Sequence, residues 1–490
     1  MGLKFCTMEQ EPIIERRWNM LPLVEFPELV QHYAPYFAEV FSAEAFIEFE
    51  RYISGLIVSE NKTVEGINRL FVIESRNQSS LNRLMTQSPF NLEALNQARM
   101  NVLASQPETR LKRDGVLGLD NTLLIHYGQD FEQIAKLFDH VTGTYVWAHD
   151  LLTLHYSDDE TDYPVLFQLW KPVEVEKLEA GLRAAKVELK ASKEALKEKE
   201  PRQWRAYLLG VWQRQQKKHP ELRSLYDTKL VIAQEKVQEW QIAHPDLHLP
   251  VTFDSWFTQP AFCQFLDKTL HMAYVGTLSE TDKVNLKTGQ ITLGEFAKSL
   301  KAEHLAAMKT GGKPVFQKNT IHFKGEKEIY YSYCQTHQIH TFSKQRLVIN
   351  YGEADLSDNP TFFISNRLLW QANGITRIRR HRWPVEVYHE EGKAEGLDQY
   401  QLREFDAIQR HVALVAVVYS LLRTAQHDPD LQIKLQRQLK VNLDGSPAAW
   451  RRATQAQCLW SLAVFISAGL TQGQNLHQIV TPLIRTICQA

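Results

Sequence analysis

Three consecutive segments between residues 115 and 171 constrain the fold more than any other region of the chain. They are GVLGLDNTLLIHY (115–127), GTYVWAHDLLTLHYS (143–157) and DYPVLFQLWK (162–171). Each is rich in β-branched and aromatic residues, and glycine and aspartate turns separate them, which is the pattern of successive strands. A helical segment at 228–244 and a strand at 248–254 follow. This strand–helix–strand order predicts an α/β core.

The sequence on either side of these segments has a different character. Residues 1–112 repeat apolar residues at helical spacing, and the chain returns to helical patterns after Pro384. Residues 314–366 are again rich in strand-forming residues. Residues 173–203 are dominated by Lys, Glu, Ala and Leu, which predicts a long solvated helix or a hairpin arm.

Composition narrows the class of protein. A chain of 490 residues with 44% hydrophobic residues is long enough for two to four structural units. The 56 Lys and Arg against 57 Asp and Glu mean that a nucleic-acid partner must be held by local basic patches. The five cysteines are scattered, as expected in a reducing cytosol. The N-terminus lacks the apolar run of a signal peptide, and the longest apolar run, VALVAVVYSLL, is too short to span a bilayer. We therefore expect a cytoplasmic protein without a membrane partner.

Two aspartates each end an apolar run. Asp120 ends GVLGLD and Asp254 ends LPVTFD. A carboxylate in this position is carried to the rim of a buried sheet, where ligands commonly bind. The alternative for either residue alone is an aspartate that caps a turn.

A third carboxylate lies in the segment RHRWPVEVYHEEGK. Pro384 suits the first turn of a helix, so a helix is predicted to start near Trp383. Glu386 and Lys393 are seven residues apart and therefore share one helix face, which Arg382 can also reach. The alternative is an ordinary salt-bridged surface.

Together these residues suit one kind of chemistry. Carboxylate oxygens are preferred ligands of Mg²⁺, and two such ions can clamp the attacking and leaving oxygens of a phosphoryl displacement. The three carboxylates therefore predict a site for two Mg²⁺ ions, for which Mn²⁺ can substitute. Arg382 and Lys393 would grip neighbouring phosphates. The basic cluster RIRRHR adds Arg377, Arg379 and Arg380 as predicted phosphate contacts. The implied substrate is a nucleic-acid backbone.

At these residues the sequence resembles the bacterial insertion-sequence transposases of the DDE type, which have an RNase H-like catalytic core. Their signature is Y-x2-R-x3-E-x6-K, and Arg382, Glu386 and Lys393 match its last three positions. Arg379 stands where the signature has tyrosine. LGLDNT and VTFDSWF resemble the strands that carry the first and second catalytic aspartates. The resemblance covers residues 50–172 and 227–425.

The resemblance implies a mixed-sheet RNase H-like core (fold class α/β, or α+β) that is interrupted by insertions and flanked by helical domains at both ends. The expected domains are an N-terminal helical, DNA end-binding domain (1–112), a first core segment with the first aspartate (113–172), a charged helical insertion (173–226), a second core segment with the second aspartate (227–285), a β-rich insertion domain (286–376), a third core segment with the glutamate helix (377–425) and a C-terminal helical domain for dimerisation or DNA contacts (426–490).

It also implies a cut-and-paste mechanism. Asp120, Asp254 and Glu386 would be the catalytic, metal-binding triad. The expected partners are double-stranded DNA, as terminal inverted repeats and target, and a second copy of the chain in the DNA complex. The protein would associate with the bacterial nucleoid when bound to DNA. Some relatives form a hairpin with help from an aromatic side chain; Phe362, Phe363 and Trp370 lie near the corresponding place, but core packing is favoured for each.

Other arrangements receive less support from the sequence. Cys334, His337 and His340 form C-x2-H-x2-H, but a strand-like segment points alternate residues to opposite sides and offers no fourth zinc ligand. His149 and Asp150 could orient metal ligands, although an ordinary strand pair is favoured. Trp256 and Phe257 are expected in the core.

Three other functions remain open. A structure-specific nuclease of the same fold would use the same triad without joining DNA. A domesticated DNA-binding protein would not cleave, but the intact triad argues against it. A two-carboxylate glycosidase leaves Arg382, Lys393 and the third acid unexplained.

Overall fold

The computed structural model describes residues 21–72, 76–287, 289–443 and 445–489. The prediction that the N-terminus lacks a signal peptide falls on residues outside these ranges. The chain divides into two compact units: one contains Met1–Leu111, Glu160–Tyr163 and Val387–Ala490, and the other contains Lys112–Asp159 and Pro164–Glu386. We call them the helical unit and the sheet unit.

The helical unit is built around one buried helix. Its elements are α1 (Glu28–Tyr33), η2 (Ala34–Phe37), α2 (Ala43–Val58), α3 (Val64–Asn68), α4 (Gln78–Thr86), α5 (Leu92–Ser105), α15 (Phe405–Ala425), α16 (Pro429–Leu439), α17 (Pro447–Thr471) and α18 (Leu476–Gln489). Helix α15 is apolar on all sides and packs against α2, α4, α5 and α17. Both α15 and α17 are long and apolar enough to cross a membrane, judged by length and composition among the described residues. The apolar window of α15 is 83% buried within the protein, as in the core helix of a soluble domain.

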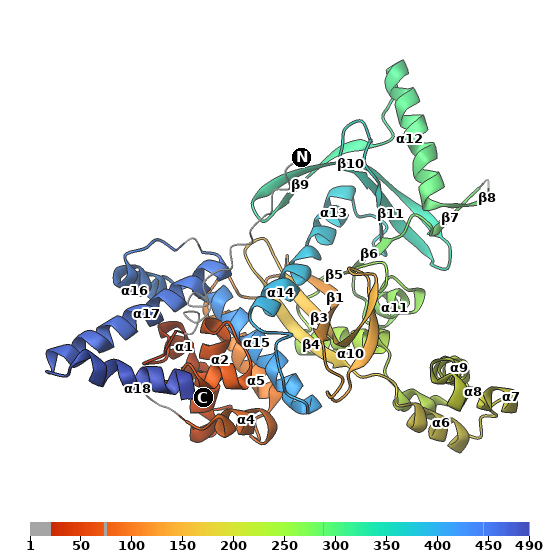
Figure 1. Cartoon of the computed structure of the whole chain (residues 1–490). Helices are drawn as coiled ribbons and strands as arrows, with labels where there is room; N and C mark the ends of the chain where they lie inside the picture. The colour runs from red at the N-terminus through yellow and green to blue at the C-terminus, as the bar shows by residue number, and fades with distance from the viewer. Residues whose placement is uncertain (1–20, 73–75, 288, 444, 490) are drawn as a thin grey trace, which may run out of the picture. The chain divides into compact units, whose positions relative to one another are not determined.

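The sheet unit contains one continuous sheet of twelve strands (Figure 1). The strands are β1 (Val116–His126), β2 (Ala135–Asp139), β3 (Thr144–Ser157), β4 (Asp162–Trp170), β5 (Val251–Phe253), β6 (Tyr274–Leu278), β7 (Lys283–Leu286), β8 (Gly289–Thr292), β9 (Gln317–Phe323), β10 (Glu326–Ile339), β11 (Lys344–Tyr351) and β12 (Thr361–Ser365). Their order is β2-β3-β1-β5-β6-β12-β11-β10-β7-β8, with β4 paired to β3 and β9 paired to β10.

The strands predicted at 115–171 and 248–254 form the region of this sheet that is consistent with an RNase H-like core. Strand β3 pairs with β1 in antiparallel orientation, whereas β5 and β6 run parallel to β1. A parallel connection needs a crossover, and α10 (Lys229–Ala243) precedes β5 while α11 (Pro260–Gln264) precedes β6. The α/β fold class with a mixed sheet and helices at both ends of the chain is therefore confirmed.

The β-rich segment of residues 286–376 continues the same sheet. Strand β12 pairs with β6, and β11 then pairs with β12. Helix α12 (Leu293–Thr310) connects β8 to β9, and α13 (Ala372–Arg380) packs on β9 and β10. Helix α13 buries Ile375 and Ile378 against Val116 and Val348. These buried contacts hold α13 on the sheet. The last turn of α13 carries the basic residues Arg377, Arg379 and Arg380.

The prediction of a long solvated helix or arm at 173–203 is wrong. The chain instead forms α6 (Val175–Ala184), α7 (Ala191–Glu194), α8 (Leu196–Lys199), α9 (Pro201–Gln215) and η3 (Pro220–Leu225). Trp204, Leu208 and Trp212 of α9 pack with Leu178 and Leu182 of α6 in a separate hydrophobic core. The apolar partners come from residues beyond 203, so the KEAL-rich stretch alone did not reveal them. We call residues 173–226 the inserted helical subunit.

Candidate active site

Sheet register brings the two predicted aspartates together. Leu119 of β1 lies opposite Phe253 of β5 in a parallel pair, so the next residues, Asp120 and Asp254, are neighbours where β5 ends. The sequence pattern suggested that Asp120 lies at the end of a strand. In the structure β1 continues past Asp120 to His126 and pairs with β3 over its whole length. The edge of the sheet at this point is formed by the end of β5, which is shorter than β1. The sequence of β1 alone does not show where β5 ends.

Asp254 is held by a tight turn. Its Oδ1 accepts hydrogen bonds from the backbone N–H groups of Trp256, at 3.0 Å, and Phe257, at 3.1 Å. The Thr258 hydroxyl donates to the Asp254 carbonyl at 2.7 Å. Asp254 therefore does cap a turn, which was the simpler interpretation of this residue. One carboxylate oxygen, Oδ2, makes none of these bonds and is the atom with which Asp254 can act on a ligand.

Glu386 comes from α14 (Trp383–Ala394), which starts at the residue that the sequence predicted. Arg382 precedes this helix and joins the first and third carboxylates. Its Nη1 donates to Asp120 Oδ2 at 2.6 Å, and its Nη2 donates to Glu386 Oε1. The side chain of Arg382 is 11% exposed and that of Asp120 is 13% exposed, so this ion pair is largely shielded from water.

The charges of the three carboxylates act on one another. The pKa of Asp120 is raised to about 7, chiefly by burial, while Arg382 opposes the rise. Both Asp254 and Glu386 raise this pKa further by charge repulsion. The three carboxylates, which come from β1, the end of β5 and α14, thus form one acidic site within the sheet unit.

Arg379 is a second arginine of this site. It is mostly buried, and burial together with the Arg382 charge lowers its pKa to about 10, while all three carboxylates oppose the shift. Its Nε donates to Thr277 Oγ1 at 2.8 Å, and its guanidinium lies 5.6 Å from the ring centroid of Phe363. Thr277 lies 102 residues away in sequence, and no sequence pattern indicated this contact.

The other predicted phosphate contacts are placed differently. Arg377 pairs with Asp159 at 2.9 Å, and Arg380 pairs with Glu328 at 2.7 Å and lies over the Phe323 ring. These two arginines already have carboxylate partners within the sheet unit. Lys393 lies in the last turn of α14 and belongs to the helical unit.

The donor set suits a hard divalent cation, because all three groups are carboxylates. Among the residues that the structure describes, no group of three or more His, Cys, Asp or Glu side chains is arranged to hold a metal ion. At the acidic site the guanidinium of Arg382 lies between Asp120 and Glu386. A cation bound by both carboxylates would take over the charge compensation that Arg382 now provides.

The zinc alternative finds no support in the described β-rich segment. Cys334 contacts the Trp370 carbonyl, His337 bonds the Tyr333 hydroxyl at 2.8 Å, and His340 bonds the side chain of Gln290 at 2.8 Å. The three side chains therefore have separate partners. A metal-orienting role for the 149–150 pair is also unsupported. His149 bonds the Glu132 carbonyl, while Asp150 binds the side chains of Asn121 and Lys229.

The aromatic residues divide into core and surface. Phe257, Phe362 and Phe363 are buried, as expected for core packing. Trp370 is partly buried and packs against the core cluster beneath α13. Trp256 was expected in the core, and this prediction is wrong. The residue is 45% exposed beside the turn that holds Asp254.

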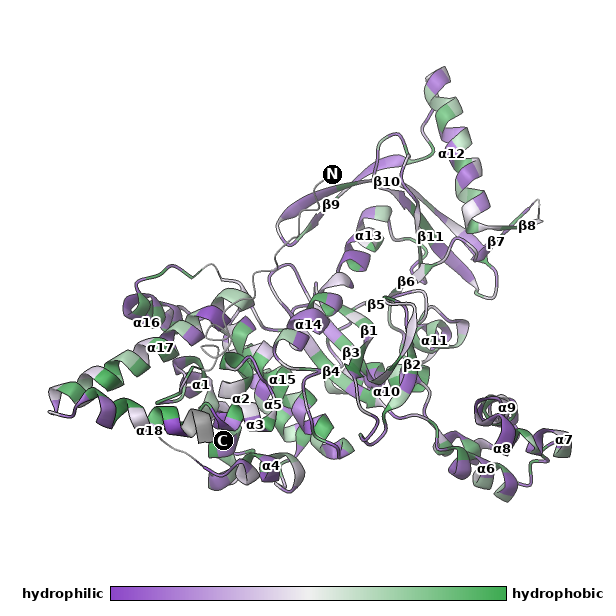
Figure 2. Ribbon diagram, viewed as in Figure 1, coloured by the Kyte–Doolittle hydropathy of each residue, from purple (hydrophilic) through white to green (hydrophobic). Residues whose placement is uncertain are grey.

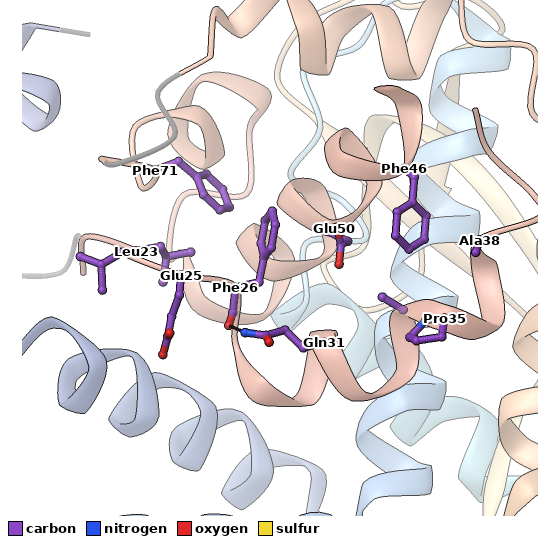
Figure 3. Close-up of a pocket in the computed structure, with 11 residues that line it drawn as sticks. Leu23, Glu25, Phe26, Gln31, Pro35, Ala38, Phe46, Glu50 and Phe71 are labelled. Carbon is purple, nitrogen blue, oxygen red and sulfur yellow. Dashed lines mark hydrogen bonds between the residues drawn. The ribbon is translucent and has the colours of Figure 1, made fainter. Parts of the chain in front are cut away.

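A cavity of about 750 Å³ in the helical unit contains none of the predicted site residues (Figure 3). Phe26 and Phe71 meet edge to face on one side of it, with ring centroids 5.9 Å apart. Glu25 and Glu50 also line it, and Glu25 accepts a hydrogen bond from Ser461. This cavity is therefore distinct from the acidic site.

Comparison with known families identifies the class of protein. The sequence profile of the DDE superfamily endonucleases matches residues 36–290, which is more than half of the chain and includes Asp120 and Asp254. The chain belongs to this family. A similar solved structure is the cryo-EM structure of the piggyBac transposase synaptic complex with hairpin DNA, with 10% sequence identity and a TM-score of 0.38. The comparison covers 95% of this chain and 81% of that one. No curated protein matches the sequence.

Proposed function

We propose that this DDE endonuclease is a cut-and-paste DNA transposase of the bacterial insertion-sequence type. One observation carries the proposal: β1 and β5 place Asp120 beside Asp254, and Arg382 joins Asp120 to Glu386. The match of Arg382, Glu386 and Lys393 to the transposase signature supports the same assignment.

In this proposal Asp120, Asp254 and Glu386 hold two Mg²⁺ ions. Bound there, the ions supply positive charge to the attacking and leaving oxygens of a phosphodiester. The family generally uses divalent metals, and the all-carboxylate donor set is the feature of this chain that fits Mg²⁺. Because the pKa of Asp120 is about 7, this carboxyl group is about half ionised at neutral pH and becomes increasingly able to bind a cation as the pH rises above 7.

The arginines position the DNA. Arg379, which bonds Thr277 and is subject to the charges of all three carboxylates, would bind a phosphate next to the scissile bond. Arg382 would move from Asp120 and Glu386 to the same phosphate or its neighbour, because a bidentate guanidinium matches phosphate geometry. Arg377, Arg380 and Lys393 would contribute less specific attraction to the backbone.

The reaction has two displacements at phosphorus. A water oxygen bonds to the phosphorus at the end of the element, the P–O3′ bond breaks, and the leaving O3′ takes a proton to become a free 3′-OH. That hydroxyl then attacks a target phosphodiester, with loss of its proton, and a target 3′-OH leaves. Each bond formed replaces one broken, so no external energy source is needed. We propose a homodimer that holds the two terminal inverted repeats during these steps.

The test is a joining assay with purified protein, labelled duplexes that carry the genomic flanks of the reading frame, Mg²⁺ and a target plasmid. The proposal predicts end cleavage and labelled plasmid with wild-type protein and with Glu390→Gln, an exposed residue one turn further along α14. Glu386→Gln should give neither product. Cleavage without labelled plasmid would identify a nuclease that does not join DNA. Specific binding without cleavage would leave only a DNA-binding protein.

A further inference from the structure

The inserted helical subunit has its own core and a fixed attachment to the sheet. Trp212 and Trp204 are buried between α9 and α6. Trp170 at the end of β4 donates from its indole Nε1 to the hydroxyl of Tyr226 at 3.2 Å, and the Tyr226 ring also contacts Trp212. A segment packed in this way presents a defined surface, unlike the long solvated helix or hairpin arm that the composition of residues 173–203 predicted.

Positive and negative residues are distributed unevenly over the surface of this inserted helical subunit. Two acids of α6 and α7 are neutralised by nearby bases. Glu179 pairs with Arg183 at 3.0 Å and with Lys197 at 3.0 Å. Glu194 pairs with the same Arg183 at 2.8 Å. The charged side of the subunit that contains α6, α7 and α8 is thus a mixture of both signs.

Helix α9 and the turn after it are different. No Asp or Glu occurs between Pro201 and His219. This stretch carries five bases, none of which forms an ion pair in the described structure: Arg202, Arg205, Arg214, Lys217 and Lys218. Arg205 is half-buried and the other four are exposed. Figure 2 shows hydrophilic residues across much of α9.

Arg202 and Arg214 lie on the exposed side of α9, about 120° apart around the helix axis, whereas the half-buried Arg205 lies opposite Arg214. The exposed face of α9, together with Lys217 and Lys218 in the turn after it, is therefore a surface of hydrogen-bond donors and positive charge. Gln213 is exposed among the bases and can also donate, whereas the side chain of Gln203 already donates to Glu200, the residue before α9. Like charges on one helix repel one another, and no carboxylate within this stretch relieves the repulsion. A partner that carries closely spaced negative oxygens would relieve this repulsion.

We propose that this face of α9 binds the phosphate backbone of double-stranded DNA, which makes the inserted helical subunit a second DNA-contacting element outside the acidic site. Arginine, lysine and glutamine are typical phosphate ligands, and such contacts position a protein without reading sequence. A helix of 15 residues is about 22 Å long, enough to follow several phosphates. The inference rests on the proposed function, because it takes the DNA substrate of that function as the partner.

The test measures the salt dependence of binding to a labelled duplex by the full-length protein. The variant replaces the exposed residues Arg202, Arg214 and Lys217 by Gln. The matched control replaces three exposed lysines on the mixed-charge side, Lys177, Lys186 and Lys193, by Gln, so both proteins lose the same formal charge. Thermal unfolding confirms that each variant is folded. A single Arg214→Gln variant provides a milder change if the triple variant is less stable.

Each lost phosphate contact lowers the slope of log K against log salt by about 0.9, so three contacts correspond to a decrease of about 2.7. The α9 variant should show this decrease, and the control should keep the wild-type slope. An unchanged slope in the α9 variant, with wild-type protein that cleaves DNA, overturns the α9 assignment and leaves the proposed function intact. Equal decreases in variant and control also overturn it. Wild-type protein that binds no duplex overturns both proposals.

Discussion

Arg382 is the residue on which the acidic site depends most in the absence of DNA. It lies against Asp120 and Glu386, while repulsion from Asp254 and Glu386 already raises the pKa of Asp120. Removing the guanidinium would leave the three carboxylates without this partner, although the charge of Arg379 would still act on them.

We expect Arg382→Gln to lower the single-turnover cleavage rate by about 10²-fold, the usual effect of removing one preorganised donor. Arg382→Lys should restore some of the rate, because it keeps the charge but loses the bidentate geometry. Rates are measured on labelled duplex at saturating Mg²⁺. A rate for Arg382→Gln within threefold of wild type would exclude a role for this residue at the scissile phosphate.

A second residue-scale prediction concerns the buried His411 of α15. One ring nitrogen bonds the Tyr52 hydroxyl at 2.8 Å and the other bonds the Gly396 carbonyl at 2.7 Å. Burial lowers its pKa from 6.5 to about 4. The unfolded chain binds a proton below pH 6.5 that the folded protein excludes until about pH 4, so stability is full above pH 6.5 and is lost as the pH falls through this window.

From these values His411 should account for about 2 kcal/mol of the stability lost between pH 7 and pH 5, at 1.36 kcal/mol per pKa unit. Urea unfolding of wild-type and His411→Gln protein at both pH values measures this. The variant, although less stable at pH 7, should lose about 2 kcal/mol less on acidification. An identical loss in both proteins would show that folding does not lower the pKa of His411.

At the scale of elements, close approach of β6 to the turn after β5 holds Asp254 in place. A Cβ on Gly276 of β6 would lie 2.8 Å from Thr258 Oγ1 and 2.9 Å from the Phe253 ring. A Cβ on Gly118 of β1 would meet its nearest atom, the His381 carbonyl oxygen, at 3.4 Å, which is ordinary contact.

We therefore predict that Gly276→Ala displaces the 254–258 turn and lowers the cleavage rate by at least about tenfold, since small misplacements of catalytic groups are costly. Gly118→Ala, the matched control, should keep the rate within about threefold of wild type. The cleavage rate and the melting temperature of both variants are measured under the same conditions. Full activity of Gly276→Ala would mean that the turn position does not limit catalysis.

The elements also show what the sequence could and could not predict. The strands around Asp120 and Asp254 and the start of α14 follow from β-branched runs and from a proline at a helix start, which are local signals. The register between β1 and β5, the Arg379–Thr277 contact and the core of the inserted helical subunit depend on residues far apart in sequence. Trp256 was expected to pack in the core, but the turn after Asp254 leaves it 45% exposed.

At the scale of the whole molecule, the carboxylates of the acidic site repel one another in the metal-free protein. A cation that binds only the folded state stabilises it, by about 2.7 kcal/mol at a concentration one hundred times its Kd. We expect Mg²⁺ or Mn²⁺ to raise the melting temperature of wild-type protein, and EDTA to reverse the increase.

The triple variant Asp120→Asn, Asp254→Asn and Glu386→Gln should show no metal-dependent shift, and Glu390→Gln should show the full shift. The measurement is differential scanning fluorimetry at pH 8, where the pKa of about 7 leaves Asp120 ionised. A shift of the same size in the triple variant would place the cation elsewhere in the protein.

The central claim is that Asp120, Asp254 and Glu386 together cleave DNA. Its most direct test is the Mg²⁺-dependent, single-turnover cleavage rate of a labelled end duplex by Asp120→Asn, Asp254→Asn and Glu386→Gln, each alone and compared with Glu390→Gln. The account predicts a loss of at least about 10³-fold for each triad variant, because each removes a ligand from one site, and a rate near wild type for the control. A triad variant that cleaves at the wild-type rate would contradict the account.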